Sequence, residues 1–185
     1  INRGVIPYKD QVLAENHHFM LRLLERALGN SQFDVDLNDT SVVIAAENLI
    51  PIPIEFVLRR YMAKSTTSTS LYSAYLKGER EFSGHSLPDR LIANGVLPYL
   101  MDTPSTKSDE HDETISERKA LALMLCTAEQ YTVMRSRGFY GFGIADEFLR
   151  GHNVILADTK LEFGVNHLGE VVVQDEVITM DSSRF

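Results

Sequence analysis

The segment from residue 158 to residue 164, DTKLEFG, carries charged residues at every second position. Successive side chains of a β-strand point to opposite faces, so Asp158, Lys160 and Glu162 would share one face, and Thr159, Leu161 and Phe163 the other. Such alternation is typical of a half-buried strand whose polar face is solvated. It equally suits a charged floor beneath a bound ligand, so the surrounding sequence must discriminate between the two interpretations.

A second charged group follows a turn that Asn166 and Gly169 predict, because these residues favour the turns of β-hairpins. The residues from 170 to 175, EVVVQD, would form the returning strand. A turn centred between residues 167 and 168 places Lys160 opposite Asp175. This pairing is a specific expectation, because a shift of one residue would change which side chains meet.

In this register Glu162 and Asp175 lie diagonally across the hairpin, about 7–8 Å apart. Mg²⁺ prefers carboxylate oxygens together with substrate phosphates, so the two residues form a candidate Mg²⁺ site. Lys160 beside them would offset their repulsion or contact a phosphate. Asp158 lies about 13 Å from Glu162 along the strand and would serve a second ligand. Residues 181–184 (DSSR) combine hydroxyls with a guanidinium and suit a phosphate or a carboxylate.

Composition and charge limit the kind of protein to which these residues belong. The chain has 185 residues, of which 44% are hydrophobic and 24% charged, as is ordinary for a globular protein. Its net charge of −8 argues against nucleic acid as a partner. The single cysteine, Cys126, excludes an internal disulfide and fits a reducing compartment. No apolar run approaches ~20 residues and the first residues show no secretory signal, so we expect no membrane partner and a cytoplasmic location.

The elements that would position these residues follow from periodicity. Apolar spacing predicts a helix over residues 10–28, and a run rich in β-formers predicts a strand over residues 54–61. Prolines make residues 48–53 an extended crossing. The remaining predictions are a strand over 41–46, irregular structure over 71–98, a helix that opens with a capping box at 114–117, a glycine-rich break over 137–143 and a strand from 153 into the charged segment. This pattern indicates an α+β fold with mostly antiparallel sheet.

Five segments occur in the order GVIPYKDQVLAE, PIPIEFVLRRY, TPSTKSDEHDETIS, ILADTKLEFG and DEVITMDSSRF. Together they resemble the phosphoribosylaminoimidazole-succinocarboxamide synthase (SAICAR synthetase) family of carbon–nitrogen ligases in purine biosynthesis. The resemblance implies a two-lobe, ATP-grasp-like fold with Mg²⁺ as cofactor. It also implies the reaction and the small-molecule partners. ATP phosphorylates the carboxylate of carboxyaminoimidazole ribonucleotide (CAIR), and the amino group of L-aspartate then displaces phosphate to give SAICAR.

The resemblance also implies roles for individual residues. The positions that handle ATP are Lys160, Glu162 and Asp175, of which Glu162 and Asp175 are the metal ligands. The catalytic candidates are Lys160, Asp158 and Asp175. The positions that bind CAIR are Arg59, Ser65, Asp158 and Arg184. The positions at the substrate cleft, where L-aspartate is a candidate ligand, are Lys107, Asp112 and Ser183.

The chain also departs from the family pattern. The glycine-rich, lysine-bearing segment that covers ATP is missing, so we expect residues 1–52 to be the remainder of the smaller lobe. Residues 53–185 would be the larger lobe, truncated at its C-terminal end. Lys64 stands where the family has glycine before Ser65. Two other interpretations stay open: a diverged relative that binds nucleotide or ribonucleotide without turnover, and an interaction domain with an acidic surface. A monomer and a homo-oligomer are both compatible with the sequence.

Overall fold

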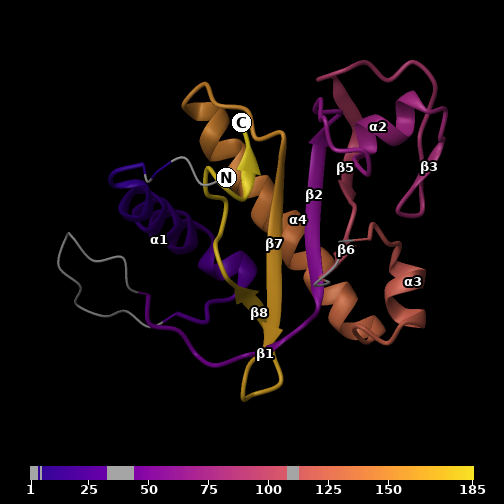
Figure 1. Ribbon diagram of the computed structural model, residues 1–185. Coiled ribbons are helices and arrows are strands. Elements are labelled where there is room, and N and C mark those ends of the chain that lie inside the picture. Colours follow the sequence, from indigo (N-terminus) through magenta and orange to yellow (C-terminus); the bar gives the residue numbers. More distant parts are fainter. Residues whose placement is uncertain (1–3, 5, 33–43, 108–112) are drawn as a thin grey trace.

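The computed structural model of the chain describes residues 4, 6–32, 44–107 and 113–185 (Figure 1). Its helices are α1 (Lys9–Leu28), α2 (Leu71–Leu76), α3 (Glu117–Ala122) and α4 (Ala128–Gly151). Its strands are β1 (Ile50–Pro51), β2 (Ile54–Tyr61), β3 (Glu81–Phe82), β4 (His85–Ser86), β5 (Val96–Asp102), β6 (Ser105–Thr106), β7 (Asp158–Val165), β8 (Val171–Gln174) and β9 (Ser183–Arg184). No helix in these ranges is long and apolar enough to cross a membrane.

Strand β7 is the centre of the main sheet. Strands β2 and β9 flank its first half, and β1 and β8 flank its second half. Strands β5 and β6 extend the sheet beyond β2, and β3 pairs with β4 in a separate hairpin. Each of these pairings is antiparallel. The prediction of an α+β fold with mostly antiparallel sheet is therefore confirmed.

Alternation along β2 and β7 divides the sheet into an apolar face and a charged face. Phe56, Leu161 and Phe163 are buried on the apolar face. The ring of Phe56 meets that of Tyr131 on α4 edge-on, with centroids 5.7 Å apart. Helix α4 lies behind β7 and β2 in Figure 1, and α1 packs into the same core. Because alternate side chains point the other way, Glu55 and Arg59 of β2 share the opposite face with the charged residues of β7.

Helix α4 continues through three glycines, so the predicted break over residues 137–143 is wrong. Two of these glycines are buried where other elements approach the helix closely. A Cβ atom at Gly141 would lie 2.7 Å from Cδ2 of Leu28 on α1. A Cβ atom at Gly138 would lie 3.2 Å from Cδ1 of Leu58 on β2. The glycines therefore permit close packing, a long-range requirement that helix propensity does not contain.

The helix predicted to open at residues 114–117 is in fact two helices. Ser116 is the N-cap of α3, and its Oγ accepts a backbone N–H one turn later at 3.2 Å. Helix α3 ends after six residues, and the chain turns at Met124, whose φ is 54°. The capping box belongs to α4. Oγ1 of Thr127 accepts the N–H of Gln130 (3.1 Å), and the Gln130 side chain accepts the N–H of Thr127 (2.9 Å).

The prediction of irregular structure over residues 71–98 is wrong in part, since it holds only for residues 77–80, 83–84 and 87–95. This region contains α2, the β3–β4 hairpin and the start of β5, which close over a second hydrophobic cluster. The buried members of the cluster are Met62, Leu71, Ala74, Phe82, Leu87, Leu97 and Met101. Helix α2 has six residues, and β3 and β4 have two each. Elements this short carry little periodicity, so contacts distant in sequence decide them.

The β7–β8 hairpin forms as predicted, but its register differs by one residue. Glu162 pairs with Gln174, which centres the loop on Leu168 rather than between residues 167 and 168. Asp175 consequently lies beyond the end of β8, and the expected pairing of Asp175 with Lys160 is wrong. The parity of a hairpin loop depends on its backbone conformation, which residue types alone do not specify.

The helix over residues 10–28 and the strand over residues 54–61 are confirmed by α1 and β2. The strand expected from residue 153 begins only at Asp158. Of the strand predicted over residues 41–46, residues 41–43 lie outside the described ranges, and Ala46 forms an isolated bridge. Helix α1, in the predicted smaller lobe, shares its hydrophobic core with β2 and α4. The lobe boundary at residue 52 remains a prediction.

Candidate functional site

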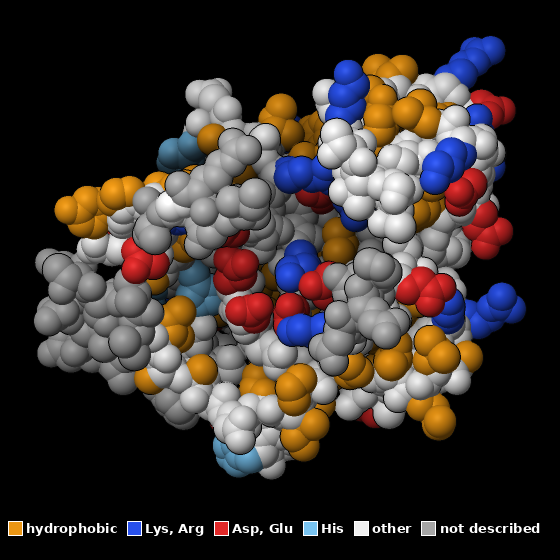
Figure 2. All heavy atoms as spheres, in the orientation of Figure 1, with side chains coloured by type: hydrophobic (Ala, Val, Ile, Leu, Met, Phe, Trp, Pro, Cys, Tyr) orange, Lys and Arg blue, Asp and Glu red, His pale blue; other side chains and the backbone are white. Residues whose placement is uncertain are grey.

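The charged face of the sheet lies between α1 on one side of the molecule and α2 and α3 on the other (Figure 1). Figure 2 shows Lys, Arg, Asp and Glu side chains gathered in a hollow over β2 and β7. The charged residues that pair on this face are Glu55, Arg59, Lys107, Asp158, Lys160, Glu162 and Arg184. Asp158 is 5% exposed and Glu162 is 4% exposed. The interpretation of β7 as a strand with a solvated polar face is therefore wrong, because buried carboxylates require specific partners.

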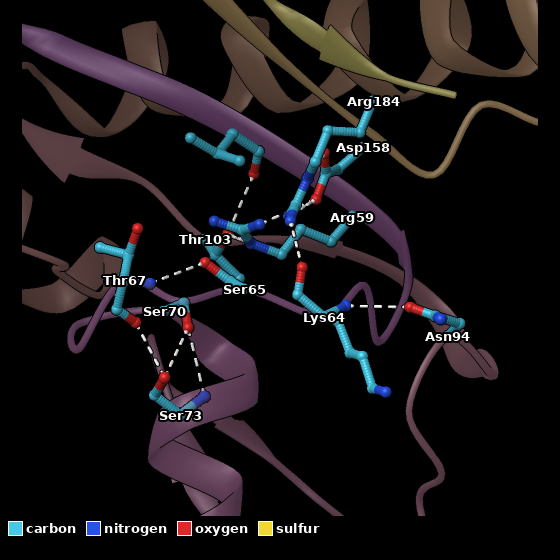
Figure 3. A network of polar contacts seen from close by, with 11 residues as sticks. Arg59, Lys64, Ser65, Thr67, Ser70, Ser73, Asn94, Thr103, Asp158 and Arg184 are labelled. Carbon is cyan, nitrogen blue, oxygen red and sulfur yellow. Dashed lines mark hydrogen bonds and ion pairs between the residues drawn. The ribbon is translucent and has the colours of Figure 1, made fainter.

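At one end of this face two arginines hold Asp158 (Figure 3). Nη1 of Arg59 donates to Oδ2 of Asp158 at 2.9 Å, and Nε of Arg184 donates to Oδ1 at 2.8 Å. The register of β2 and β9 places Arg59 and Arg184 opposite Asp158 on either side of β7. Burial lowers the pKa of Arg59, whereas the bond to Asp158 raises the pKa of Arg184. Two guanidinium groups against one carboxylate leave one net positive charge, so this end of the face attracts an anion.

A cavity of about 250 Å³ opens beside the arginine pair. Its lining residues are Val57, Arg59, Asp158, Thr159, Lys160, Asp181, Ser182, Ser183 and Arg184. Oγ of Ser183 lies 2.8 Å from Oγ1 of Thr159, so β9 brings a hydroxyl pair to the same place. Guanidinium, ammonium and hydroxyl groups in one cavity are the donors that a phosphate group takes.

The loop that carries Ser65 adjoins this cavity. Nη1 of Arg184 donates to the carbonyl oxygen of Lys64 (3.1 Å), and Oγ of Ser65 accepts the N–H of Thr67 (3.2 Å) (Figure 3). A second cavity, of about 520 Å³, is lined by Lys64, Ser65, Thr66 and Tyr72. The backbone of Lys64 does not have a positive φ, so this position does not require the glycine of the family pattern. The predicted ribonucleotide residues Arg59, Ser65, Asp158 and Arg184 therefore come together.

The other end of the charged face lies about 13 Å along β7 and is called the acidic end. Here lysines and glutamates alternate. Nζ of Lys107 donates to Oε2 of Glu162 at 2.6 Å. Nζ of Lys160 lies 2.9 Å from Oε1 of Glu55 and 3.5 Å from Oε1 of Glu162. Burial opposes ionisation of Glu162 and Lys160, but these partners outweigh it, lowering the pKa of Glu162 and raising that of Lys160. The pKa of Lys107 is raised by its bond to Glu162, so Lys107, Lys160 and Glu162 are held in their charged forms.

Asp175 lies at this acidic end, directly after the residue that pairs with Glu162. The side chain of Asp175 is exposed. The pKa of Lys107 is raised mainly by the hydrogen bond from Lys107 to Glu162, and the charge of Asp175 raises it further. Within the described ranges, no three His, Cys, Asp or Glu side chains are arranged to hold a metal by themselves. Glu162 and Asp175 still fit Mg²⁺, because this ion takes one or two carboxylates and completes its shell with substrate phosphates and water.

A buried network beneath the site fixes Arg59. Nε of Arg59 donates to Oγ1 of Thr103 at 2.8 Å, and the preceding residue, Asp102, is 2% exposed. The carboxylate of Asp102 accepts hydrogen bonds from His85, Tyr131 and Arg135. Burial would raise the pKa of Asp102, but these bonds outweigh burial and hold the pKa well below its usual range. The network ties the end of β5 to α4 and so positions the backbone from which Thr103 contacts the arginine.

Two predicted residues of the substrate cleft have outcomes of their own. Lys107 binds Glu162 and so belongs to the acidic end, together with the predicted nucleotide residues. Asp112 lies outside the described residues. Sequence reasoning missed Glu55 and Thr103. Alternation along β2 could have found Glu55, which shares a face with Arg59, whereas Thr103 carries no local signal.

The fold and the site define an α+β protein with an anion-binding end and an acidic end on one sheet face. The profile of the SAICAR synthetase family matches residues 1–185. The chain is 36% identical over 182 residues to a putative phosphoribosylaminoimidazole-succinocarboxamide synthase 2 of Agrobacterium fabrum, covering 97% of this chain and 56% of the relative. It is 38% identical over 182 residues to the phosphoribosylaminoimidazole-succinocarboxamide synthase of Legionella pneumophila strain Paris, covering 98% and 57%. The chain therefore belongs to the SAICAR synthetase family, and the resemblance seen in the sequence is confirmed.

Solved structures agree with this assignment. A SAICAR synthase from Saccharomyces cerevisiae in complex with SAICAR aligns with a TM-score of 0.82 and 26% identity, over 98% of this chain and 64% of that chain. A type-2 SAICAR synthetase in complex with ADP shares the fold, with a TM-score of 0.75 and 22% identity over 94% and 66%. The chain spans a little over half the length of the two curated relatives.

Proposed function

We propose that this protein is an ATP-dependent ligase that joins L-aspartate to CAIR through an acyl phosphate, giving SAICAR, ADP and phosphate. The observation that carries the proposal is the division of the charged face. An arginine pair lies at one end and a lysine–glutamate cluster at the other, about 13 Å away along β7. The phosphate of the ribonucleotide would bind the first end, and the phosphates of ATP the second. Membership of the family and the ligands of the two solved relatives support this arrangement.

The chemistry explains why both ends are needed. The carboxylate of CAIR is a poor electrophile until one of its oxygens becomes part of a leaving group. Transfer of the γ-phosphoryl group of ATP to that oxygen supplies the leaving group. The amine of L-aspartate then forms the C–N bond while the C–O bond to phosphate breaks, and the amine loses a proton. Protein catalysis of such transfers consists mainly of positioning and charge stabilisation.

The residues of the site then have distinct tasks. Arg59 and Arg184 bind the ribonucleotide phosphate, and Asp158 fixes the direction of both guanidinium groups. Lys160 belongs to the acidic end and also lines the cavity at the arginine end. It stays cationic, so it offsets negative charge as the phosphoryl group moves. Glu162 and Asp175 would hold Mg²⁺. When bound, this ion would neutralise part of the charge on the phosphates of ATP.

The proposal extends to the surroundings of the site. The protein works in the cytoplasm as a monomer or homo-oligomer, with small molecules as its partners and without nucleic acid or membrane. Its net charge of −8 supports the absence of nucleic acid. Residues 1–52 belong to the smaller lobe and residues 53–185 to the larger lobe, with ATP between them. Lys107, Asp112 and Ser183 remain the candidate residues for binding L-aspartate.

Release of ADP from Mg-ATP, measured with CAIR in the presence and absence of L-aspartate, tests the proposal. We expect release that needs both substrates. Lys160→Ala should lower turnover by about 100-fold or more, because it removes a charge that faces the transferred group. Lys119→Ala is the matched control, since Lys119 lies on the surface of α3 and pairs with Glu113. Turnover by Lys160→Ala at the level of this control would contradict the assignment.

Two other outcomes point to different proteins. Release without L-aspartate would indicate that the acyl phosphate forms but that the amine site is altered. Absence of release by the folded protein would favour a relative that binds nucleotides without turnover. A thermal-shift assay with Mg-ATP separates such a relative from an interaction domain, because a ligand that binds the folded state raises its stability.

A further inference from the structure

The turn that follows β8 has a strained backbone. Asp175 has a φ of 59° and Ile178 has a φ of 48°. Aspartate occupies the left-handed region more readily than most residues other than glycine, whereas a β-branched residue such as isoleucine is a rare occupant, so the strain lies at Ile178. Such strain persists only where surrounding contacts over-determine the backbone. Because Asp175 carries one carboxylate of the candidate Mg²⁺ site, the contacts that hold this turn bear on function.

A buried histidine of α1 contacts the turn between its two residues of positive φ. Nδ1 of His17 accepts the backbone N–H of Val177 at 2.9 Å. His17 is 2% exposed and Val177 is 0% exposed, so the N–H group could not replace this bond with one to water. The two residues are 160 positions apart in the chain. The bond therefore ties the turn after β8 to α1, a helix near the other end of the chain.

The environment of His17 keeps the ring in the form that this contact needs. Burial lowers the pKa of His17, which favours the neutral ring. A neutral ring that accepts at Nδ1 carries its proton on Nε2, which lies beside the side-chain amide of Gln32. The Val177 bond therefore requires the Gln32 amide to present its oxygen to Nε2, and in that orientation both ring nitrogens have partners. Neighbouring His18 lies on the exposed side of α1.

The remainder of the turn is held in other ways. Oγ1 of Thr179 accepts the N–H of Asp181 at 3.3 Å and that of Ser182 at 3.1 Å, which closes the later part of the turn on itself. Lys9 at the start of α1 pairs with Asp181, but both side chains are nearly half exposed. Exposed pairs of this kind stabilise little. Oγ1 of Thr179, which is fully buried, also donates to the carboxylate of Glu176, but this bond lies within the turn itself. The His17 contact ties the turn to α1 through buried groups, two residues from Asp175.

We propose that His17 is a positioning residue that holds the strained turn and thereby directs the carboxylate of Asp175 toward the acidic end of the site. The consequence for Mg²⁺ rests on the proposed function, whereas the hold on the turn does not. A side chain that only filled space at position 17 would need no acceptor at Nδ1. The proposal therefore separates hydrogen bonding from packing, and variants of position 17 can do the same.

The test compares three variants of the protein with the wild type. His17→Leu keeps an apolar side chain but removes the acceptor. His17→Asn keeps an acceptor at the place of Nδ1, and His18→Leu controls for a change on the same helix. Amide hydrogen exchange reports the Val177 bond, and calorimetry with Mg²⁺ and ADP reports the acidic end. We expect His17→Leu to lose protection at Val177 and to bind Mg-ADP about 10- to 100-fold more weakly, as when a group that orients a metal ligand is removed.

We expect His17→Asn and His18→Leu to behave as the wild type in both measurements. Retained protection at Val177 in His17→Leu, or lost protection with unchanged Mg-ADP affinity, would overturn the proposal. If His17→Leu does not fold, the ¹⁵N spectrum of wild-type His17 decides: a proton on Nε2 supports the hold on the turn, and a proton on Nδ1 refutes it. If the wild type does not bind Mg-ADP, the proposed function fails, while the exchange of Val177 still decides the role of His17.

Discussion

Replacement of Gly141 by alanine tests whether α1 and α4 pack as closely as the structure indicates. A Cβ atom at this position would lie 2.7 Å from Cδ2 and 3.1 Å from Cγ of Leu28, which is fully buried and has little room to move. The same substitution at Gly143 meets nothing within 4 Å. Both residues lie inside α4, so both substitutions gain the same helix propensity. Their comparison isolates the cost of the steric conflict.

The expected magnitudes follow from two opposing effects. Glycine to alanine inside a helix stabilises by roughly 0.8–1 kcal/mol. Inserting a methyl group into a packed core costs about 1–3 kcal/mol. Gly143→Ala should therefore raise the free energy of unfolding by roughly 1 kcal/mol. Gly141→Ala should lie about 1–3 kcal/mol below Gly143→Ala, which ranges from near-neutral to destabilising relative to the wild type.

Urea unfolding followed by far-UV circular dichroism measures this difference, provided that the m-value is the same in both variants. In thermal unfolding each kcal/mol corresponds to about 2–4 °C for a chain of this length. Equal stabilisation by both substitutions would refute the close approach of α1 and α4. It would also leave the presence of glycine at position 141 unexplained.

Three further predictions concern the site and its support. Arg184→Ala should weaken binding of the ribonucleotide more than that of ATP, because Arg184 lies at the arginine end; equal loss of both affinities in a calorimetric titration would contradict its role. Asp175→Asn should abolish Mg²⁺-dependent turnover while leaving the circular dichroism spectrum and Tm unchanged, and normal turnover would refute the metal assignment. His85 donates to Asp102, and this bond raises the pKa of His85 above its ordinary value of 6.5. The stabilisation from this bond should therefore be complete below pH 6.5 and lost as pH rises through the raised pKa. Urea unfolding across this pH range should lose that dependence in His85→Gln, and an unchanged dependence would show that another group titrates.

Part of this structure follows from local sequence. Apolar residues at helical spacing predict α1, and a run of β-formers predicts β2, because each pattern repeats over a whole element. Strict alternation places Asp158, Lys160 and Glu162 on one face of β7, whatever the partner strands are. Residue order along a single strand also determines that the arginine end and the acidic end are about 13 Å apart.

Other features depend on contacts between distant segments. The hairpin register follows from a loop centred on Leu168, which removed the expected pairing of Lys160 with Asp175. Helix α4 tolerates its glycines because other elements pack against them. The short elements over residues 71–98 exist because they close a cluster.

The sequence by itself determined the family, the antiparallel α+β class and the identity of most charged groups in the site. Only the tertiary structure decided which of those groups meet. Glu55 and Lys107 neutralise the lysine and glutamate of β7, and Thr103 fixes Arg59. These partners come from separate strands, and a buried charge selects its partner by distance in space rather than in sequence. The burial of Asp158 and Glu162 makes β7 part of the candidate site, and no pattern within the strand could specify that burial.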